Sequence, residues 1–168
     1  ITGSVRALCA AAQDAAQKLG FQCRMLTDCL DCEAREAGRF LASIARSHQQ
    51  TERPLAFFAG GETVVHLTGQ GLGGRNQELA LAAAPGLRGT QNTAVCSFGS
   101  DGTDGPTDAA GGFVDQSSDT ALRAAGLDVP QVLAENDAYH ALQKIGGLLM
   151  TGPTGTNVND LAMVLIWR

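Results

Sequence analysis

The sequence has few of the residues that nucleic-acid binding and membrane insertion require. Aromatic residues make up 5% of the 168 positions, with one Trp and one Tyr, so few side chains could stack on bases. Lysine and arginine number 12 against 17 aspartates and glutamates, a net charge of -5, and they form no basic stripe. No apolar run approaches the roughly 18 residues that span a membrane. We therefore expect neither nucleic acid nor a membrane as a partner.

The cysteines lack the pattern of a disulfide framework or a zinc site. There are five: Cys9, Cys23, Cys29, Cys32 and Cys96. Their odd number and scattered spacing indicate free thiols in a reducing compartment, so we expect an intracellular protein, in the cytoplasm or a mitochondrion. Cys29 and Cys32 form a C-x-x-C that loosely fits a redox motif opening a helix. Zinc would need two further ligands, and the histidines show no paired ligand spacing, so ordinary intracellular cysteines are favoured.

The composition is that of a folded domain. The chain is 44% hydrophobic and 17% charged, which is typical of globular proteins, and its length favours one domain over residues 1–168. It begins at Ile1, without methionine and without a basic-then-apolar signal segment. We expect it to be a piece of a longer protein.

Helical and strand patterns alternate along the chain. Helices are predicted at 4–20, 31–50, 74–87 and 117–126, with one or two more within 129–147. Strands are predicted at 21–26, 54–61, 63–67, 92–100 and 111–115, with two more within 148–167. Several strands are apolar on both faces. This pattern predicts an α/β fold, a three-layer sandwich with a mainly parallel mixed sheet flanked by helices, whose last two strands are antiparallel.

Glycine-rich polar loops follow four of the predicted strands. They are "GGET" at 60–63, "TGQGLGGRNQE" at 68–78, "SFGSDGTDGPTDAAGG" at 97–112 and "TGPTGTNVND" at 151–160. In open α/β sheets, ligands bind outside the carboxyl ends of the strands. If the strands are parallel, these loops converge on one edge and form a site there.

The loop at 68–78 resembles known nucleotide motifs only in part. Gly69, Gly71 and Gly74 match G-x-G-x-x-G, but the acid expected about 20 residues later in a dinucleotide site is missing. No Gly-Lys-Ser/Thr occurs, which excludes a Walker P-loop. A glycine-rich turn that opens a helix can still bind an anion through its backbone N–H groups and the helix dipole.

Arg75 stands in the first turn of that predicted helix, where a positive charge gains nothing from the dipole. A guanidinium beside exposed amides suits a carboxylate or a phosphate. The alternative is an i,i+3 ion pair with Glu78 that serves only the helix. We favour the functional interpretation.

The loop at 97–112 carries three aspartates: Asp101, Asp104 and Asp108. The twelfth position from Asp101 is Gly112, which excludes an EF-hand. A magnesium–phosphate site needs only one or two carboxylates, and a general base needs one. Asp-Gly pairs also form tight turns without any ligand, and the spacing leaves both interpretations open.

Three motifs in order, "GGRNQELAL", "SFGSDGTDGPTDAAGG" and "TGPTGTNVNDL", resemble the C-terminal MOFRL domain of the ATP-dependent glycerate 2-kinases. The resemblance runs over nearly the whole chain, and "GGET" fits it. It implies transfer of the γ-phosphate of ATP to D-glycerate, with Mg²⁺, to give 2-phosphoglycerate. It also implies an active site in the cleft to an N-terminal Rossmann-like domain. That domain would carry a catalytic lysine and is absent here, so the isolated chain should be inactive.

By the resemblance, Arg75 and Asp101 are the catalytic residues of this domain. The substrate- or phosphate-binding candidates are Gly61, Glu62, Gly73, Gly74, Asn76, Gly102, Thr103, Thr154 and Asn157. Asp101 or Asp104 could hold the metal, and whether Asp101 acts as base or metal ligand stays open. The alternatives are a non-catalytic regulatory module that binds a small anion and, more weakly, a C-x-x-C redox domain.

Overall fold

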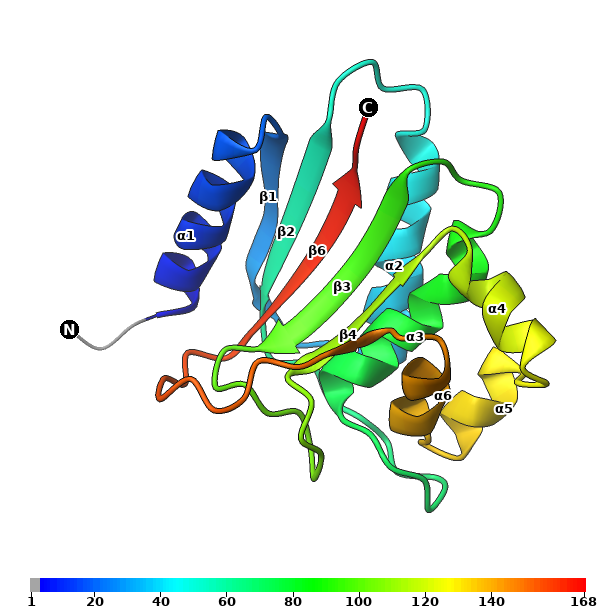
Figure 1. The fold of residues 1–168 in the computed structure, drawn as a ribbon. Helices are drawn as coiled ribbons and strands as arrows, with labels where there is room; N and C mark the ends of the chain where they lie inside the picture. Colours follow the sequence, from blue (N-terminus) through cyan, green and yellow to red (C-terminus); the bar gives the residue numbers. More distant parts are fainter. Residues whose placement is uncertain (1–3) are drawn as a thin grey trace.

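Six strands form one mixed sheet in the computed structural model, which describes residues 4–168 (Figure 1). The strands are β1 Gln22–Leu30, β2 Leu55–Gly61, β3 Thr93–Gly99, β4 Gly111–Asp115, β5 Leu148–Leu149 and β6 Asp160–Ile166. The helices are α1 Val5–Lys18, α2 Ala34–Ser47, α3 Arg75–Leu87, α4 Ser118–Ala124, α5 Val129–Ala134 and α6 Ala138–Lys144. The strand order is β1-β2-β6-β3-β4-β5.

The predicted α/β class and the mixed sheet flanked by helices are confirmed, but the prediction of a mainly parallel sheet is wrong. Within residues 4–168, β1 and β2 are the one parallel pair, and the other four pairs are antiparallel. The physical reason is β6, which inserts between β2 and β3 and runs against both. A strand buried on both faces has the same apolar pattern in either direction, so the pattern does not report this orientation.

The expected convergence of loops still occurs, because β1, β2 and β3 all point the same way. β6 begins where β2 and β3 end: Asp160 pairs with Gly61 on one side and with Gly99 on the other. The loops at 60–63, 97–112 and 151–160 therefore meet at one edge of the sheet, the lower edge in Figure 1. We call this the site edge.

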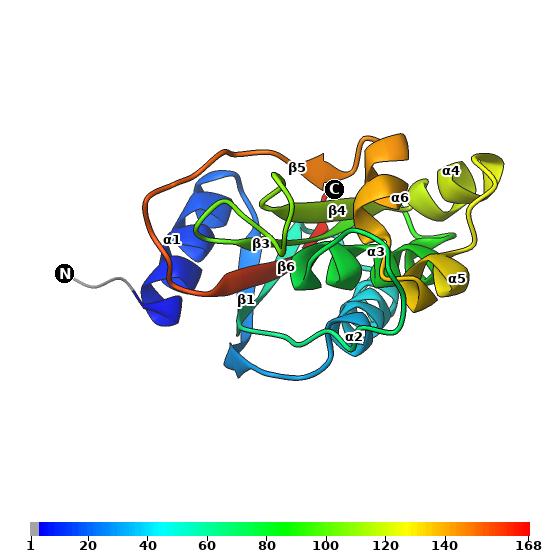
Figure 2. The ribbon, with the colours of Figure 1, turned by 90° about the horizontal axis from the view of Figure 1, so that it is seen from below.

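Helices cover the sheet unequally. α1 packs on one face, over β1 and β2, whereas α2 and α3 pack on the other and α4, α5 and α6 extend that layer (Figures 1 and 2). Alternate residues divide between the two cores, with Ala56 and Phe58 on the α1 side and Phe57 and Ala59 on the other. The three-layer arrangement follows from this alternation.

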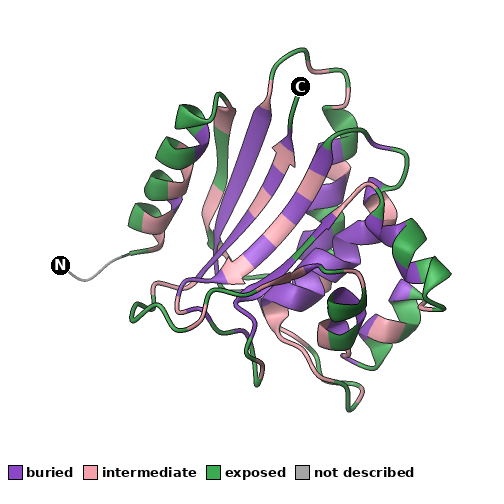
Figure 3. Ribbon diagram, viewed as in Figure 1, coloured by how far each residue is buried: buried purple, intermediate pink, exposed green. Residues whose placement is uncertain are grey.

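α3 is the central helix of the thicker layer and is buried along most of its length (Figure 3). Its Ala-rich surface contacts α2, the sheet and the short helices. A Cβ on Gly38 of α2 would lie 2.1 Å from the carbonyl oxygen of Leu79, so glycine allows the two helices to touch. Asn76, Gln77 and Glu78 in the first turn are buried although they are polar, which requires partners for all three.

Two local predictions differ from the structure. Residues 63–67 do not form a strand; Val64 makes an isolated bridge to Glu33, and both neighbours of β2 are already taken by β1 and β6. The two strands predicted within 148–167 exist, but they are not partners, since β5 pairs with β4. No helix in residues 4–168 combines the length and apolarity needed to cross a membrane.

Candidate active site at the sheet edge

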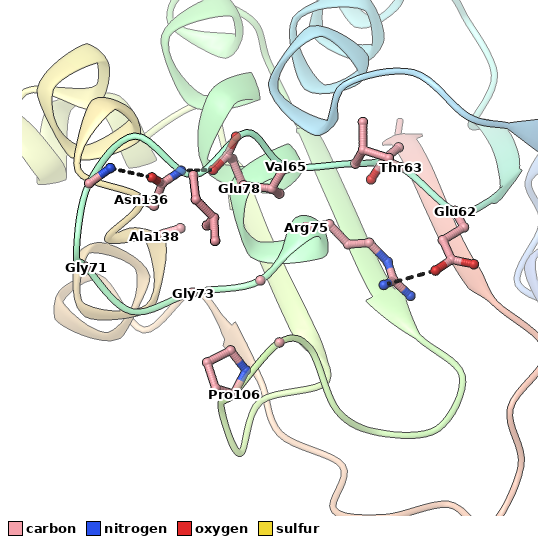
Figure 4. A pocket seen from close by; sticks show the side chains of 15 residues that line it. Glu62, Thr63, Val65, Gly71, Gly73, Arg75, Glu78, Pro106, Asn136 and Ala138 are labelled. Carbon is pink, nitrogen blue, oxygen red and sulfur yellow. Dashed lines mark hydrogen bonds and ion pairs between the residues drawn. The ribbon is translucent and has the colours of Figure 1, made fainter.

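Arg75, the first residue of α3, is held by two carboxylates at the site edge. Its Nε lies 2.5 Å from Asp160 Oδ2 and its Nη2 lies 3.0 Å from Asp160 Oδ1, a bidentate pair. Its Nη1 is 3.3 Å from Glu62 Oε1 (Figure 4). The hydrogen bond to Asp160 raises the pKa of Arg75, which stays charged. The side chain is 36% exposed, so a fixed guanidinium still faces solvent.

The alternative partner of Arg75, Glu78, is engaged elsewhere. Its Oε1 accepts a hydrogen bond of 2.9 Å from Arg35 of α2, and its Oε2 accepts one of 3.2 Å from Asn136 Nδ2. Arg35 also donates to the carbonyl of Leu133. Glu78 therefore joins α2, α3 and the α5–α6 corner, and the i,i+3 pair that was the alternative for Arg75 does not form.

Asp104 occupies the anion position at the start of α3. Its carboxylate accepts hydrogen bonds from the backbone N–H of Asn76 (3.0 Å), the backbone N–H of Gln77 (2.8 Å) and the Asn76 side chain (3.1 Å). Burial raises the pKa of Asp104, although these N–H donors act in the opposite direction. The N-terminus of α3, which we expected to bind an anionic ligand, is thus capped by Asp104 of the same chain.

Asn76 and Asp104 consequently leave the set of ligand candidates. The Asn76 side chain is buried, and its Oδ1 accepts a hydrogen bond of 2.6 Å from Ser97. Each carboxylate oxygen of Asp104 accepts at least one N–H group of α3. We assign both residues to the folding of this edge rather than to substrate or metal.

Most glycines of the segment 68–74 serve close packing. A Cβ on Gly74 would lie 2.3 Å from Asp104 Cγ, and one on Gly69 would lie 2.3 Å from the Cα of Glu135. Gly73 differs, because its nearest neighbours would be 3.4 Å away, an ordinary contact. Two glycines were expected to bind phosphate here. At Gly74, the close approach of Asp104 accounts for the need for glycine, whereas Gly73 has room for a side chain.

Asn136 holds the segment 68–74 in place and was not found from the sequence. It sits between α5 and α6 with a φ of 55°, where asparagine is tolerated. Its Oδ1 accepts the backbone N–H groups of Thr68 (2.7 Å) and Gly69 (2.9 Å), and its Nδ2 donates to the carbonyl of His66. The one available signal was the "END" turn between two helical patterns.

Asp101 lies at the end of β3, half-buried. Its Oδ1 accepts the backbone N–H of Thr103 at 3.0 Å, so the Asx turn weighed against a ligand role is present. Within residues 4–168, no donor bonds its Oδ2. The Asx turn therefore occupies one carboxylate oxygen and leaves the other available.

The loop at 151–157 interlocks with the Asp101 turn. Thr154 donates its backbone N–H to the carbonyl of Asp101 at 3.0 Å and its hydroxyl to the carbonyl of Ser100. Gly102 has a φ of 85°, and a Cβ there would lie 2.0 Å from the carbonyl oxygen of Gly152. Thr103 and Thr154 are exposed and each donates a backbone N–H to Asp101, and Asn157 is exposed in the same loop as Thr154.

Gly99 is the point at which the catalytic candidates approach each other. A Cβ there would lie 3.1 Å from Asp101 Oδ1 and 3.5 Å from Asp160 Oδ1. Asp160, which binds Arg75, and Asp101 thus both lie beside Gly99 at the end of β3. Sequence reasoning missed Asp160, although it is the last charged residue before the apolar run of β6.

A cavity of about 580 Å³ extends from Arg75 and Glu62 along the segment 68–74 to Asn136 and Ala138 (Figure 4). No cluster of three or more His, Cys, Asp or Glu residues in the range 4–168 is placed to hold a metal ion. Cys29 and Cys32 are free, exposed thiols located before α2, and neither belongs to this cavity's lining.

The fold and this edge define a class: an α/β domain that presents charged side chains, beside a cavity, at one edge of a mixed sheet. The MOFRL family model matches residues 55–160, and the chain belongs to this family.

Similar proteins include a D-glycerate 2-kinase of Thermotoga maritima, 55% identical over 99% of this chain and 41% of its own length. A glycerate 2-kinase of Pyrococcus horikoshii is 45% identical over 94% of this chain and 37% of its own length. The crystal structure of the Thermotoga maritima glycerate kinase superposes with a TM-score of 0.93 at 56% identity, covering 98% of this chain and 41% of that one. The chain thus spans about two fifths of the length of these relatives.

Proposed function

We propose that this chain is the part of an ATP-dependent D-glycerate 2-kinase that forms one wall of its active site. The full enzyme would transfer the γ-phosphate of ATP to the 2-hydroxyl of D-glycerate, giving 2-phosphoglycerate and ADP. One observation carries the proposal: Arg75, fixed by Asp160, lies across Gly99 from Asp101 at an exposed sheet edge. This occurs in a chain whose relatives are glycerate 2-kinases.

The other wall would come from an N-terminal Rossmann-like domain of the same polypeptide. The charge of the site edge supports the need for a partner. One guanidinium lies among the carboxylates of Glu62, Asp101 and Asp160, so a phosphate entering alone would meet net negative charge. Further positive charge, from Mg²⁺ and from the lysine expected on the partner domain, would complete the site.

The residues at hand fit Mg²⁺. Magnesium binds one or two carboxylates and completes its shell with phosphate oxygens and water, and Asp101 Oδ2 and the exposed Glu62 offer oxygens of this kind. When bound, the ion would neutralise charge on the transferred phosphate. Asp101 would hold the ion or accept the proton of the 2-hydroxyl, and Arg75 would bind the glycerate carboxylate or the transferred phosphoryl group.

Gly61, Gly102, Thr103, Thr154 and Asn157 stay proposed contacts of substrate or phosphate, because all belong to the loops that meet at the site edge. We also propose an intracellular location, since all five cysteines are free thiols.

The test uses the full-length protein that contains this chain. Arg75→Ala should lower kcat/KM for phosphorylation of D-glycerate by at least about a hundredfold, the scale of a lost transition-state contact. Arg75→Lys keeps the charge but loses the bidentate fork, and it should recover only part of the rate. The isolated 168-residue chain should show no turnover.

Urea unfolding of both variants separates a catalytic loss from a folding loss. Near-normal turnover of a folded Arg75→Ala protein would remove Arg75 from the mechanism. Normal turnover combined with loss of a ligand response would instead support the regulatory module that binds a small anion.

A further inference from the structure

The cavity beside Arg75 has two chemically different ends. At one end lie the guanidinium of Arg75 and the carboxylate of Glu62, the only charged groups that the lining exposes among residues 4–168. Toward the other end the lining is apolar side chains and glycine backbone, including Val65, Pro106 and Ala138 with Gly71 and Gly73 (Figure 4).

The apolar end exposes no ionised group in the described chain. Glu78 borders it, but its side chain is 3% exposed and is neutralised by Arg35 at 2.9 Å. The side-chain amide of Asn136 is already hydrogen-bonded to Glu78 and to the backbone of the segment 68–74. An ionised ligand group would lose its hydration there without gaining a partner, so this end suits an uncharged group.

One wall of the cavity, the segment 68–74, is held by backbone hydrogen bonds to the α5–α6 region. Gly71 donates its backbone N–H to the carbonyl of Glu135 at 2.7 Å, and Tyr139 donates its own to the carbonyl of Leu72 at 2.9 Å. Val64 and Leu67, which also belong to the lining, are 50% and 82% exposed, so part of the cavity is open to solvent. A partly apolar hollow of this volume is typical of sites for small organic molecules.

The two substrates of the proposed reaction differ in the way that the two ends differ. Glycerate is small, ionised and polar throughout. ATP joins an uncharged heteroaromatic base to a polyanion. Resting on the proposed function, we propose that this cavity binds the nucleoside part of ATP. The base lies against the apolar lining of Val65, Pro106 and Ala138, and the phosphates extend toward Arg75.

Gly73 is the position at which the proposal can be tested. Among the cavity glycines 69, 71, 73, 74 and 105, it alone leaves ordinary contact distance for a Cβ, 3.4 Å from Ala138 and from Asn136 O. Gly73→Ala and Gly73→Val would therefore narrow the cavity in two steps. Gln70→Val is the matched control, because Gln70 is exposed in the same segment and lies outside the lining.

The experiment measures three quantities on the full-length protein: KM for ATP, KM for D-glycerate, and the Kd of adenosine by calorimetry. Gly73→Val should raise the KM for ATP and the adenosine Kd at least about tenfold, since an overfilled pocket rejects its ligand. Gly73→Ala should act in the same direction with a smaller change. The KM for glycerate should stay within twofold, and Gln70→Val should change nothing.

Arg75→Ala should have the opposite selectivity. It should weaken the binding of ATP, whose phosphates it would contact, while leaving the Kd of adenosine within twofold. The proposal is overturned if Gly73→Ala and Gly73→Val, with normal circular dichroism and urea midpoints, raise the KM for glycerate instead. It is also overturned if they change neither KM or if the wild type binds no adenosine. Failure of the wild type to phosphorylate glycerate would defeat the proposed function alone, since loss of adenosine binding in Gly73→Val would still locate a nucleoside there.

Discussion

Asp101 and Asp104 stand three residues apart in one loop, yet the fold puts them in opposite environments. Asp101 keeps one carboxylate oxygen available at the site edge, while Asp104 is buried and turned into the first turn of α3. The difference teaches that an acidic, glycine-rich loop is not one functional unit. The carboxylate of Asp104 stabilises the fold of the site edge, whereas that of Asp101 keeps one oxygen available to a ligand.

The largest expected effect is that of Asp101→Asn on turnover. Asparagine still offers an oxygen to the N–H of Thr103, so the Asx turn should survive. It cannot accept a proton or neutralise a metal, so kcat in the full-length protein should fall at least about a hundredfold. Steady-state kinetics with a urea control would check this, and a folded variant with near-normal turnover would refute the role of Asp101.

Asp104→Asn should give the converse result, a loss of stability rather than of chemistry. The variant side chain has one acceptor oxygen, and its NH₂ group would face an N–H of α3. We expect the free energy of unfolding to drop by about 1–3 kcal/mol, the cost of unsatisfied buried donors. Urea unfolding measures it. A larger effect on the turnover of the folded protein than on its stability would contradict the cap assignment.

The stabilisation that Asp104 contributes should depend on pH. Burial raises the pKa of Asp104 above the ordinary value of an aspartate, so the folded state holds this proton more tightly than the unfolded state. The linked stabilisation is fully present below the unfolded pKa and is lost as pH rises through the folded pKa. The stability gap between wild type and Asp104→Asn should therefore narrow as pH rises from about 4 toward 7. A gap that widens over this range would show that the hydrogen bonds to α3, and not burial, dominate.

Asp108, the third aspartate of the loop, should matter least. It is exposed, and its Oδ1 accepts a hydrogen bond of 2.8 Å from the hydroxyl of Tyr139. This bond raises the pKa of Tyr139. Asp108→Asn should lower that pKa toward its usual value and leave turnover and the urea midpoint unchanged. The chain has one tyrosine, so absorbance titration of the 168-residue chain reads it directly, and an unshifted titration would mean that the bond is absent in solution.

The sequence predicted the elements better than their arrangement. The helices at 74–87 and 117–126 and the buried strands at 54–61 and 92–100 appear with small shifts at their ends, because local periodicity reports burial. The short strand at 63–67 failed, since no free position beside β2 remained for it. Arg75 was singled out correctly as out of place at a helix start, but its partner Asp160 is 85 residues away. No local pattern could supply that pairing.

What the sequence by itself determined is the α/β class, the polar glycine-rich character of the loops, and the family to which the motifs belong. Glycine and aspartate content and apolar periodicity are local properties, and they are read without knowing the fold. The tertiary structure alone decided which carboxylate is exposed, which glycines pack and which leave space, and what holds Arg75. These follow from the insertion of β6 between β2 and β3 and from the docking of the Asp104 turn on α3. Both are contacts between residues distant in the chain, whose geometry no single segment encodes.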